Sequence, residues 1–202
     1  MQDLPARRSN RDRSEETREK LIHAARKLFV EHSYAGTGTP EIVSAAGLTR
    51  GALYHHFADK QALFRAVVER EAEQVAEEIE AKTGLTLSPL EALIEGGRAF
   101  LEAMAVPGRT RLLLLDGPAV LGRVVMDEID GKHGNRTLEE GLAAAMKARV
   151  IREAPLLPLT ALLGAAYDRA ALAIADGRDV EAFHATLAVL IQGLARDDDG
   201  IE

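Results

Sequence analysis

Two short apolar-faced segments, joined by a turn centred on Gly47, constrain most strongly how this 202-residue chain can fold. The first segment begins at Pro40, directly after Thr39, and its apolar residues recur at helical spacing until Gly47 ends it. Only Leu48 separates this glycine from Thr49, whose hydroxyl is suited to cap a second helix. Two short helices with so tight a connection predict a helix-turn-helix arrangement.

The second segment has one apolar side and one polar side. Leu53 and Phe57 are four residues apart, so in a helix both point inward, while Leu48 and Leu53 stand at the positions of a hydrophobic staple. Asp59 is then placed to cap a long amphipathic helix from Lys60 to about Lys82. The sequence therefore predicts a supporting helix directly after the helix-turn-helix pair.

The flanking sequence predicts one helix before this pair and several behind it. Residues 1–13 are polar and rich in arginine, which predicts a flexible basic arm, and Ser14 is the expected cap of a helix that ends near His32. After Thr83-Gly84, Ala- and Leu-rich segments predict further helices with breaks at Gly and Pro, among them Gly117-Pro118. We expect three parts: the arm 1–13, a helix-turn-helix domain 14–60, and a linking helix with a C-terminal domain 61–202. The further helices are expected near residues 88–105, 108–115, 119–131, 136–152, 157–176 and 179–195.

Composition supports an all-α protein and excludes several kinds of site. Apolar residues make up 47% of the chain but aromatic ones only 4%, so a core of Leu, Ala, Val and Ile is expected. The absence of Cys excludes disulfides, thiolate metal sites and a Cys nucleophile. Asp168 and Arg169 interrupt the longest apolar stretch, residues 156–175, and the first thirty residues contain no apolar signal region. A soluble cytoplasmic protein without a membrane partner is expected.

Charge is distributed unevenly along the chain, although its net value is −7. Residues 1–60 hold ten Lys and Arg against eight Asp and Glu, whereas the remainder is strongly acidic. This asymmetry favours one end that faces DNA and one that does not. We find no metal-ligand spacing, no dinucleotide-binding loop and no framed nucleophile, so neither a cofactor nor enzyme activity is predicted.

Residues 17–64 resemble the N-terminal domain of the TetR family of transcriptional regulators. The most specific part of the resemblance is the gap-free run AAGLTRGALYHHF, residues 45–57, followed by Asp59-Lys60 and Leu63-Phe64. Beyond residue 82 the resemblance extends only to a general plan of helices. It implies an N-terminal DNA-binding domain and a C-terminal domain for effector binding and dimerisation.

The predicted second helix has a polar face suited to DNA. Arg50 at its N-terminal end can donate to guanine O6 and N7, and Thr49 can contact a phosphate or a thymine methyl. Gly51 allows close approach of the backbone. Tyr54, His55 and His56 supply further donors, although a merely solvated helix surface has the same composition. The resemblance implies DNA contacts at all these positions. It adds Lys60 and, at the start of the preceding helix, Thr37 and Thr39.

Two positions depart from the family pattern. Ser33 stands where the family often has Gly, and Gly38 stands where it often has Ser or Thr, which removes a hydroxyl from the start of the first short helix. The arginines of residues 1–13 either enter a minor groove or belong to a solvated tail.

The C-terminal part is expected to hold an effector pocket and a dimer surface. Small-molecule pockets are mainly apolar with a few polar groups. The expected lining residues are Phe100, Met104, Leu113, Met126 and Tyr167, with Asp116, His133 or Arg169 to orient a ligand. Helices 157–176 and 179–195 are more apolar than one core stripe requires, which predicts a four-helix dimer interface, unless both are central to a monomeric core. Its expected residues are Leu159, Leu163, Phe183, Leu187, Leu190 and Ile191.

Taken together, these features predict a homodimeric repressor that a small-molecule effector releases from a palindromic operator. Two alternatives share parts of the evidence. An effector-independent regulator or activator would use the same DNA-binding head, whereas a helical enzyme or carrier would have no salt-dependent affinity for DNA.

Overall fold

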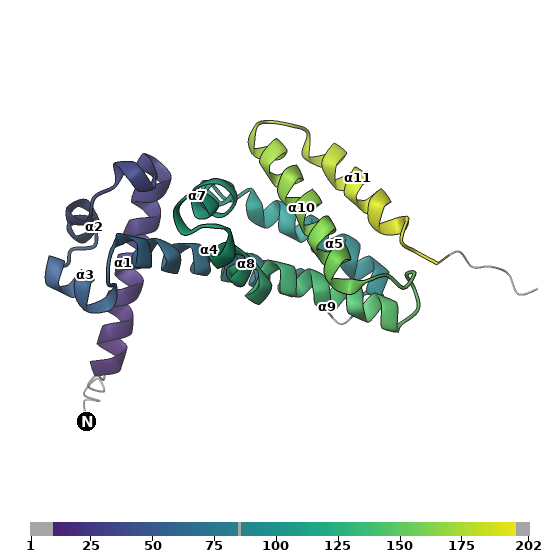
Figure 1. Ribbon diagram of the computed structural model, residues 1–202, viewed down its shortest axis with the longest axis horizontal. Coiled ribbons are helices and arrows are strands. Elements are labelled where there is room, and N and C mark those ends of the chain that lie inside the picture. Colours follow the sequence, from purple (N-terminus) through teal and green to yellow (C-terminus); the bar gives the residue numbers. More distant parts are fainter. Residues whose placement is uncertain (1–9, 85, 197–202) are drawn as a thin grey trace, which may run out of the picture. The chain divides into compact units, whose positions relative to one another are not determined.

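The computed structural model describes residues 10–84 and 86–196 (Figure 1). Within these residues the regular secondary structure is helical, apart from one isolated β-bridge between Ile151 and Ala195, and the all-α prediction is therefore confirmed. The chain divides into two compact units, one that ends at Val68 and one that begins at Glu69.

The N-terminal unit consists of α1 (Asn10–Gly36), α2 (Thr39–Ala45), α3 (Arg50–His56) and the first turns of α4 (Lys60–Lys82). Its core is built from the apolar faces that the helical spacing predicted, including Leu21, Ile42 and Leu53, each fully buried. The rings of Phe29 and Phe64 meet edge to face, with their centroids 5.2 Å apart. The beginning of α4 therefore packs with α1 inside this unit.

Helix α1 begins earlier than the sequence suggested. It starts at Asn10, so residues 10–13 are helical and Ser14 is not its cap, while residues 1–9 of the expected arm lie outside the described residues. Arg and Asp are tolerated in helices, and the hydroxyl of Thr17 donates to the carbonyl of Arg13, so nothing local ends the helix at Ser14. At its other end, Ser33 has φ 65° and ψ 167°, which kinks the chain near the predicted end at His32.

The C-terminal unit continues along α4 and adds seven α-helices and a π-helix. Helix α5 packs against α9, α10 and α11. The bounds are α5 (Pro89–Met104), α6 (Arg109–Arg111), the π-helix η1 (Leu112–Asp116), α7 (Gly117–Leu121), α8 (Arg123–Lys132), α9 (Gly134–Lys147), α10 (Leu156–Ala175) and α11 (Val180–Gln192).

The break expected at Gly117-Pro118 is wrong. The π-helix passes directly into α7, because Pro118 lies in the first turn of α7, where a missing N–H costs little. Gly117 is needed there for packing, since a Cβ at this position would lie 2.9 Å from both the Leu112 carbonyl oxygen and the Met126 sulfur. The actual break is at Gly122, whose φ of 80° favours glycine.

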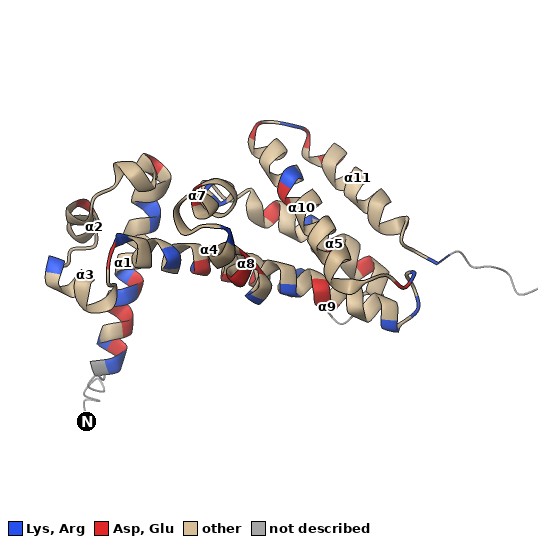
Figure 2. Cartoon of the chain, viewed as in Figure 1, with Lys and Arg blue, Asp and Glu red and all other residues tan. Residues whose placement is uncertain are grey.

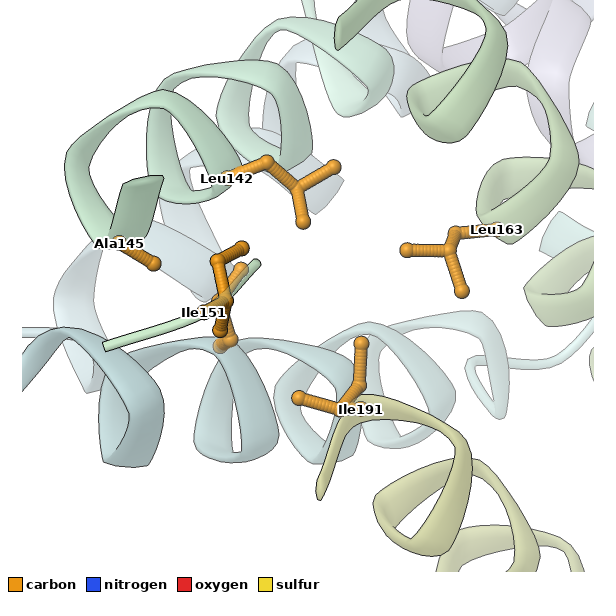
Figure 3. Packing of buried hydrophobic residues seen from close by; sticks show 6 residues of the cluster. Leu142, Ala145, Ile151, Leu163 and Ile191 are labelled. Atoms are coloured by element: carbon orange, nitrogen blue, oxygen red, sulfur yellow. The ribbon is translucent and has the colours of Figure 1, made fainter. Parts of the chain in front are cut away.

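The core of the C-terminal unit gathers side chains from α5, α9, α10 and α11 (Figure 3). Ile151 lies between α9 and α10, and its bridge to Ala195 ties the segment after α9 to the segment after α11. The buried members of this cluster are Leu93, Leu142, Ala145, Ile151, Leu163 and Ile191. Burial of such a cluster holds the four helices around one centre.

Candidate nucleic-acid interface and ligand cavity

Helix α3 is a short helix with one face fixed in the core and the other face open. The Thr49 hydroxyl accepts a hydrogen bond from the Ala52 N–H at 3.2 Å, so the predicted cap is confirmed. Leu53 and Phe57 are buried, as their spacing predicted. Arg50 and Tyr54 lie on the exposed face, and 44% of Tyr54 is accessible. A polar surface is thus held on an anchored helix.

Polar contacts link this exposed face to α2. Hydrogen bonds with the side chains of Thr39 and then Arg50 lower the pKa of the Tyr54 phenol below its ordinary value. The Arg50 guanidinium carbon also lies 5.5 Å from the centre of the Tyr54 ring. Thr39, Arg50 and Tyr54 therefore form one connected polar surface across α2 and α3.

The two histidines complete the exposed end of α3. Their ring centroids are 5.2 Å apart, and His55 is the more exposed of the two. Burial, together with the nearby His55 and Arg18, lowers the pKa of His56. His56 is consequently neutral near pH 7, with one ring N–H to donate.

Lys60 is half-buried and ties the start of α4 to the end of α1. Its ammonium donates to the carbonyl oxygens of Tyr34 at 2.9 Å and Thr37 at 3.0 Å, and it lies 4.1 Å from the centre of the Tyr34 ring. An ammonium has three donors, so one remains beyond these two internal bonds.

Thr37 is buried, so its side chain is not available for the expected phosphate contact. Only 1% of Thr37 is exposed, and its hydroxyl donates to the carbonyls of Ser33 at 2.8 Å and Leu28 at 3.1 Å. The hydroxyl thus satisfies carbonyls freed at the kink of α1. Helix α2 begins at Thr39, one residue before the expected start at Pro40. Gly38 is its N-cap, and the Glu41 carboxylate accepts a hydrogen bond from the Gly38 N–H at 2.8 Å.

Gly51 lies on the exposed face beside Arg50. A Cβ placed there would meet, within 4 Å, only the Thr49 hydroxyl at 3.8 Å, so packing inside the chain leaves room for a side chain. Glycine costs about 1 kcal/mol in a helix relative to alanine. The chain's own packing does not account for this cost.

The C-terminal unit contains a cavity of about 270 Å³, bordered by α4, α5, α8, α9 and α10. Of the expected pocket residues it includes Phe100 and Tyr167, whose ring centroids are 5.8 Å apart. Ile79, Leu93 and Leu138 add apolar wall. Its volume is near the lower end of the range for small-molecule sites, and its wall is mainly apolar.

Six other expected pocket residues do not line this cavity, among them His133 and Arg169. Met104, Leu113 and Met126 are buried in packing elsewhere, and the Asp116 carboxylate pairs with the Arg111 guanidinium at 3.2 Å. For Leu113 and Asp116 the reason is the unpredicted π-helix, which changes the face on which residues 112–116 lie.

Four acidic residues that were not among the expected pocket residues also line the cavity, and two of them lie in its less exposed part. These two are Asp130 on α8 and Asp168 on α10. Burial raises the pKa of each to about 6, with further contributions from Asp127 on Asp130 and from Asp130 on Asp168. An acidic residue within an otherwise apolar helical stretch, as at Asp168, was the one available signal.

Each of the two units matches a family of known proteins. Residues 21–67 match the family model described as bacterial regulatory proteins, tetR family, and residues 90–197 match the tetracyclin repressor-like C-terminal domain. A TetR-family transcriptional regulator from Pectobacterium atrosepticum is 34% identical, with a TM-score of 0.75, over 94% of this chain and 99% of that one. The chain belongs to the TetR family.

Two other relatives are more distant or match in part. The transcriptional regulator AcrR of Shigella flexneri is 35% identical over 108 residues, which are 53% of this chain and 50% of AcrR. RolR, solved in complex with resorcinol, shares the fold with a TM-score of 0.71 at 18% identity, over 94% of this chain and 92% of RolR. The matched segment thus spans half the length of AcrR, whereas both solved structures are covered almost completely.

In this TetR-family chain, α10 and α11 expose a broad apolar surface. Figure 2 shows α11 almost without charged residues. Leu157 and Leu162 on α10 are 68% and 72% exposed, and Val189 and Leu190 on α11 are 64% and 49% exposed. Among the described helices, α10 alone is long and apolar enough to cross a membrane, a test that core helices of soluble proteins also pass.

Some of the residues expected at a dimer interface lie instead inside the unit. Leu163, Leu187 and Ile191 are buried, and Leu159 packs against the same core cluster. Phe183 is half-buried, so Leu190 is the most exposed of the six. The spacing predicted both helices but did not separate their buried faces from their exposed faces, because both faces are apolar.

Proposed function

We propose that this TetR-family chain is a homodimeric transcriptional repressor that binds a palindromic operator and leaves it when a small-molecule effector binds. The observation that carries the proposal is the exposed polar face of α3, which holds Arg50, Tyr54 and His55 on a helix anchored by Leu53 and Phe57. The N-terminal end of such a helix enters a major groove in helix-turn-helix proteins. We infer that it acts in the cytoplasm, where the operator DNA lies.

The proposed contacts divide between bases and phosphates. Arg50 is exposed at the N-terminal end of α3 and would read guanine, and Gly51 beside it would allow the backbone to approach the DNA. Thr39 and Tyr54 would bind phosphate as one hydrogen-bonded pair. Lys60 would offer its third donor, and Thr49, His55 and His56 would add further contacts.

The proposed dimer forms through the exposed apolar faces of α10 and α11. One helix-turn-helix reads half a site, so a palindrome requires a second copy related by a twofold axis. Leu157, Leu162, Val189 and Leu190 would then pack in a four-helix bundle.

The effector would act through α4. This helix supplies Ile79 and Glu80 to the cavity, and its first turns, up to Val68, belong to the DNA-reading unit. RolR, which shares the fold, was solved with a small aromatic ligand. For a hundredfold loss of operator affinity, an effector needs a preference of only about 2.7 kcal/mol for the non-binding state.

Selection of protected DNA from a random pool, using the purified chain, tests the proposal. We expect a palindrome, bound with an affinity that falls steeply with salt. Arg50→Ala should weaken binding to that site by about 1–3 kcal/mol and relax the sequence preference at one position of each half-site. Tyr54→Phe removes one hydroxyl and should weaken binding to all sequences alike.

Arg178→Ala provides a matched control, because Arg178 is an exposed arginine of the C-terminal unit. Its operator affinity should equal that of the unmodified chain. No enriched sequence, or equal binding by the Arg50→Ala protein, would contradict the assignment of α3.

A further inference from the structure

The charged residues that line the cavity of the C-terminal unit are all acidic. They are Glu80 on α4, Asp130 on α8, Glu140 on α9 and Asp168 on α10, and none of the lining residues is Lys, Arg or His. A cavity with charges of one sign creates a potential that attracts a ligand of the opposite sign. The chemistry of the four carboxylates decides where such a ligand would bind.

Two of these carboxylates already share one arginine partner within the protein. The Arg136 guanidinium lies 2.6 Å from the Glu80 carboxylate and 3.2 Å from that of Glu140, and all three side chains are well exposed. This ion-paired group belongs to the wet edge of the cavity. Water solvates the negative charge that remains, so this group needs no ligand.

Asp130 and Asp168 lie deeper in the cavity, and they differ from Glu80 and Glu140 in their lack of an arginine partner among the described residues. Over residues 10–84 and 86–196, no hydrogen bond or ion pair joins either carboxylate to a cation. Burial raises the pKa of both to about 6, and the charge of Asp130 acts directly on Asp168. Two neighbouring carboxylates without a counter-ion are costly near neutral pH, and a bound cation would remove that cost.

The rest of the cavity is built for an apolar body. Phe100 and Tyr167 meet edge to face at an interplanar angle of 70°. Glycines bring side chains close to the helix backbones: a Cβ at Gly97 would overlap the Tyr167 hydroxyl, and one at Gly164 would lie 2.7 Å from the Asn135 side-chain oxygen. The aromatic pair offers both apolar contact and ring faces that attract cations.

We infer that the effector of this chain is an organic cation with an apolar body, held by an ammonium group between Asp130 and Asp168 and by ring contacts with Phe100 and Tyr167. The inference rests on the proposed function for the role of the ligand, but not for the existence of the site. An anionic effector would be repelled by the inner pair, Asp130 and Asp168, and a neutral one would leave that pair without a counter-ion.

Three probes of one shape test the charge preference: 4-phenylbutylamine, 4-phenylbutan-1-ol and 4-phenylbutanoate. Titration calorimetry on the full chain at pH 7.5, without DNA, measures their affinities. We expect the amine, which is protonated at this pH, to bind about tenfold more tightly than the alcohol or better, because charged hydrogen bonds are the stronger ones. The carboxylate should bind weakest.

Asp168→Asn and Asp130→Asn keep the side-chain shape but remove one charge each. Both should reduce the affinity for the amine towards that for the alcohol and leave the alcohol's affinity unchanged. Asp176→Asn is the matched control, since Asp176 is exposed at the end of the same helix as Asp168. Thermal melts of each variant verify that the fold is retained.

The inference is overturned if the alcohol binds as well as the amine, if the carboxylate binds best, if no probe binds, or if Asp168→Asn binds the amine like the unmodified chain. The effector role is tested separately, by adding the amine to the complex with operator DNA. Tight binding of the amine without release of DNA would keep the cation site and reject the effector role. Release of DNA by an anionic compound and not by the amine would keep the effector role of the cavity and reject an organic cation as the effector.

Discussion

At the scale of single residues, the backbone of Ser33 stores strain. Its φ of 65° and ψ of 167° lie in a region that is almost confined to glycine and costs of order 1–3 kcal/mol for other residues. Ser33→Gly should therefore raise the free energy of unfolding, by about 1 kcal/mol after the loss of the hydrogen bond that the Ser33 hydroxyl accepts from the Gly36 N–H. Urea unfolding followed by circular dichroism measures the change.

The control for Ser33→Gly is Ser44→Gly. Ser44 is an exposed residue within α2, where glycine lacks any conformational advantage and should destabilise the chain by about 0.5–1 kcal/mol. Opposite signs for the two substitutions support the strain at Ser33. A loss of stability in both would show that the hydroxyl contributes more than the backbone costs.

Asp168 should make stability depend on pH. Its pKa rises from 3.8 to about 6 on folding, so the folded chain holds this proton over a range in which the unfolded chain has released it. Its ionisation therefore costs no stability below pH 3.8, and the cost grows as the pH rises and is complete above about 6. Asp168→Asn should stabilise the chain by about 1–3 kcal/mol at pH 7.5 and by little near pH 4.

Denaturant unfolding at both pH values measures this difference, with Asp176→Asn as the exposed control. A gain for Asp168→Asn of the same size at pH 4 and pH 7.5 would contradict a burial cost of the charge. A gain in the free energy of unfolding only at the higher pH would mean that the charge of Asp168 destabilises the fold, as residues of functional sites often do.

The N-caps of α3 and α4 and the buried pair of α3 were predictable from the local sequence. A cap forms its hydrogen bond within three residues, and an i,i+4 pair lies within about one turn. Thr49 and the Asp59 carboxylate, which accepts from the Ala62 N–H at 2.7 Å, are examples. Thr37 was not predictable in this way. Its hydroxyl is held by backbone carbonyls near the kink at Ser33. No local sequence pattern predicts that a serine has a positive φ.

At the scale of elements, a buried arginine fixes α6 to α4. The Arg109 guanidinium is 3% exposed and donates to the Glu71 carboxylate at 3.1 Å, the Glu78 carboxylate at 2.9 Å and the Gln74 side-chain oxygen at 3.1 Å. It also donates to the Ala103 carbonyl at 2.7 Å. Arg109→Met should destabilise the chain by about 3–5 kcal/mol, because Glu71 would lose its buried guanidinium partner.

The double variant Arg109→Met with Glu71→Leu separates charge from packing. It removes both buried charges, so it should recover most of the loss, and the two effects should be far from additive. Urea midpoints of the two single variants and the double variant provide the cycle. Additive losses would mean that Arg109 and Glu71 stabilise the fold independently.

Helices with a clear apolar period were predicted to within a few residues, as for α4 and α5, because the period follows from burial of one face. The segment from Arg109 to Gly122 was not. A π-helix shifts the face by one residue without any break in composition, and a proline in the first turn of a helix is compatible with continuation as well as with a stop. Most of the cavity lining was missed for a different reason, because it combines helices that are distant in sequence.

At the scale of the whole molecule, the proposed dimer depends on one apolar surface. Leu162 on α10 and Val124 on α8 are almost equally exposed, at 72% and 73%, but only Leu162 lies on the surface assigned to the partner. Leu162→Asp would bury a carboxylate in the proposed four-helix interface. It should turn the dimer into a monomer in light scattering, whereas Val124→Asp should leave it dimeric.

The effect on DNA binding follows from the geometry of two linked reading helices. In a dimer, binding of one half-site brings the second helix to its own half-site at a high effective concentration, so loss of the dimer costs affinity without any change in α3. Leu162→Asp should consequently weaken binding to the full palindrome by at least about a hundredfold. Its affinity for a single half-site should equal that of Val124→Asp, because α3 is unchanged in both. A Leu162→Asp chain that remains dimeric, or a monomer that holds the palindrome as tightly as the unmodified chain, would place the twofold contact elsewhere.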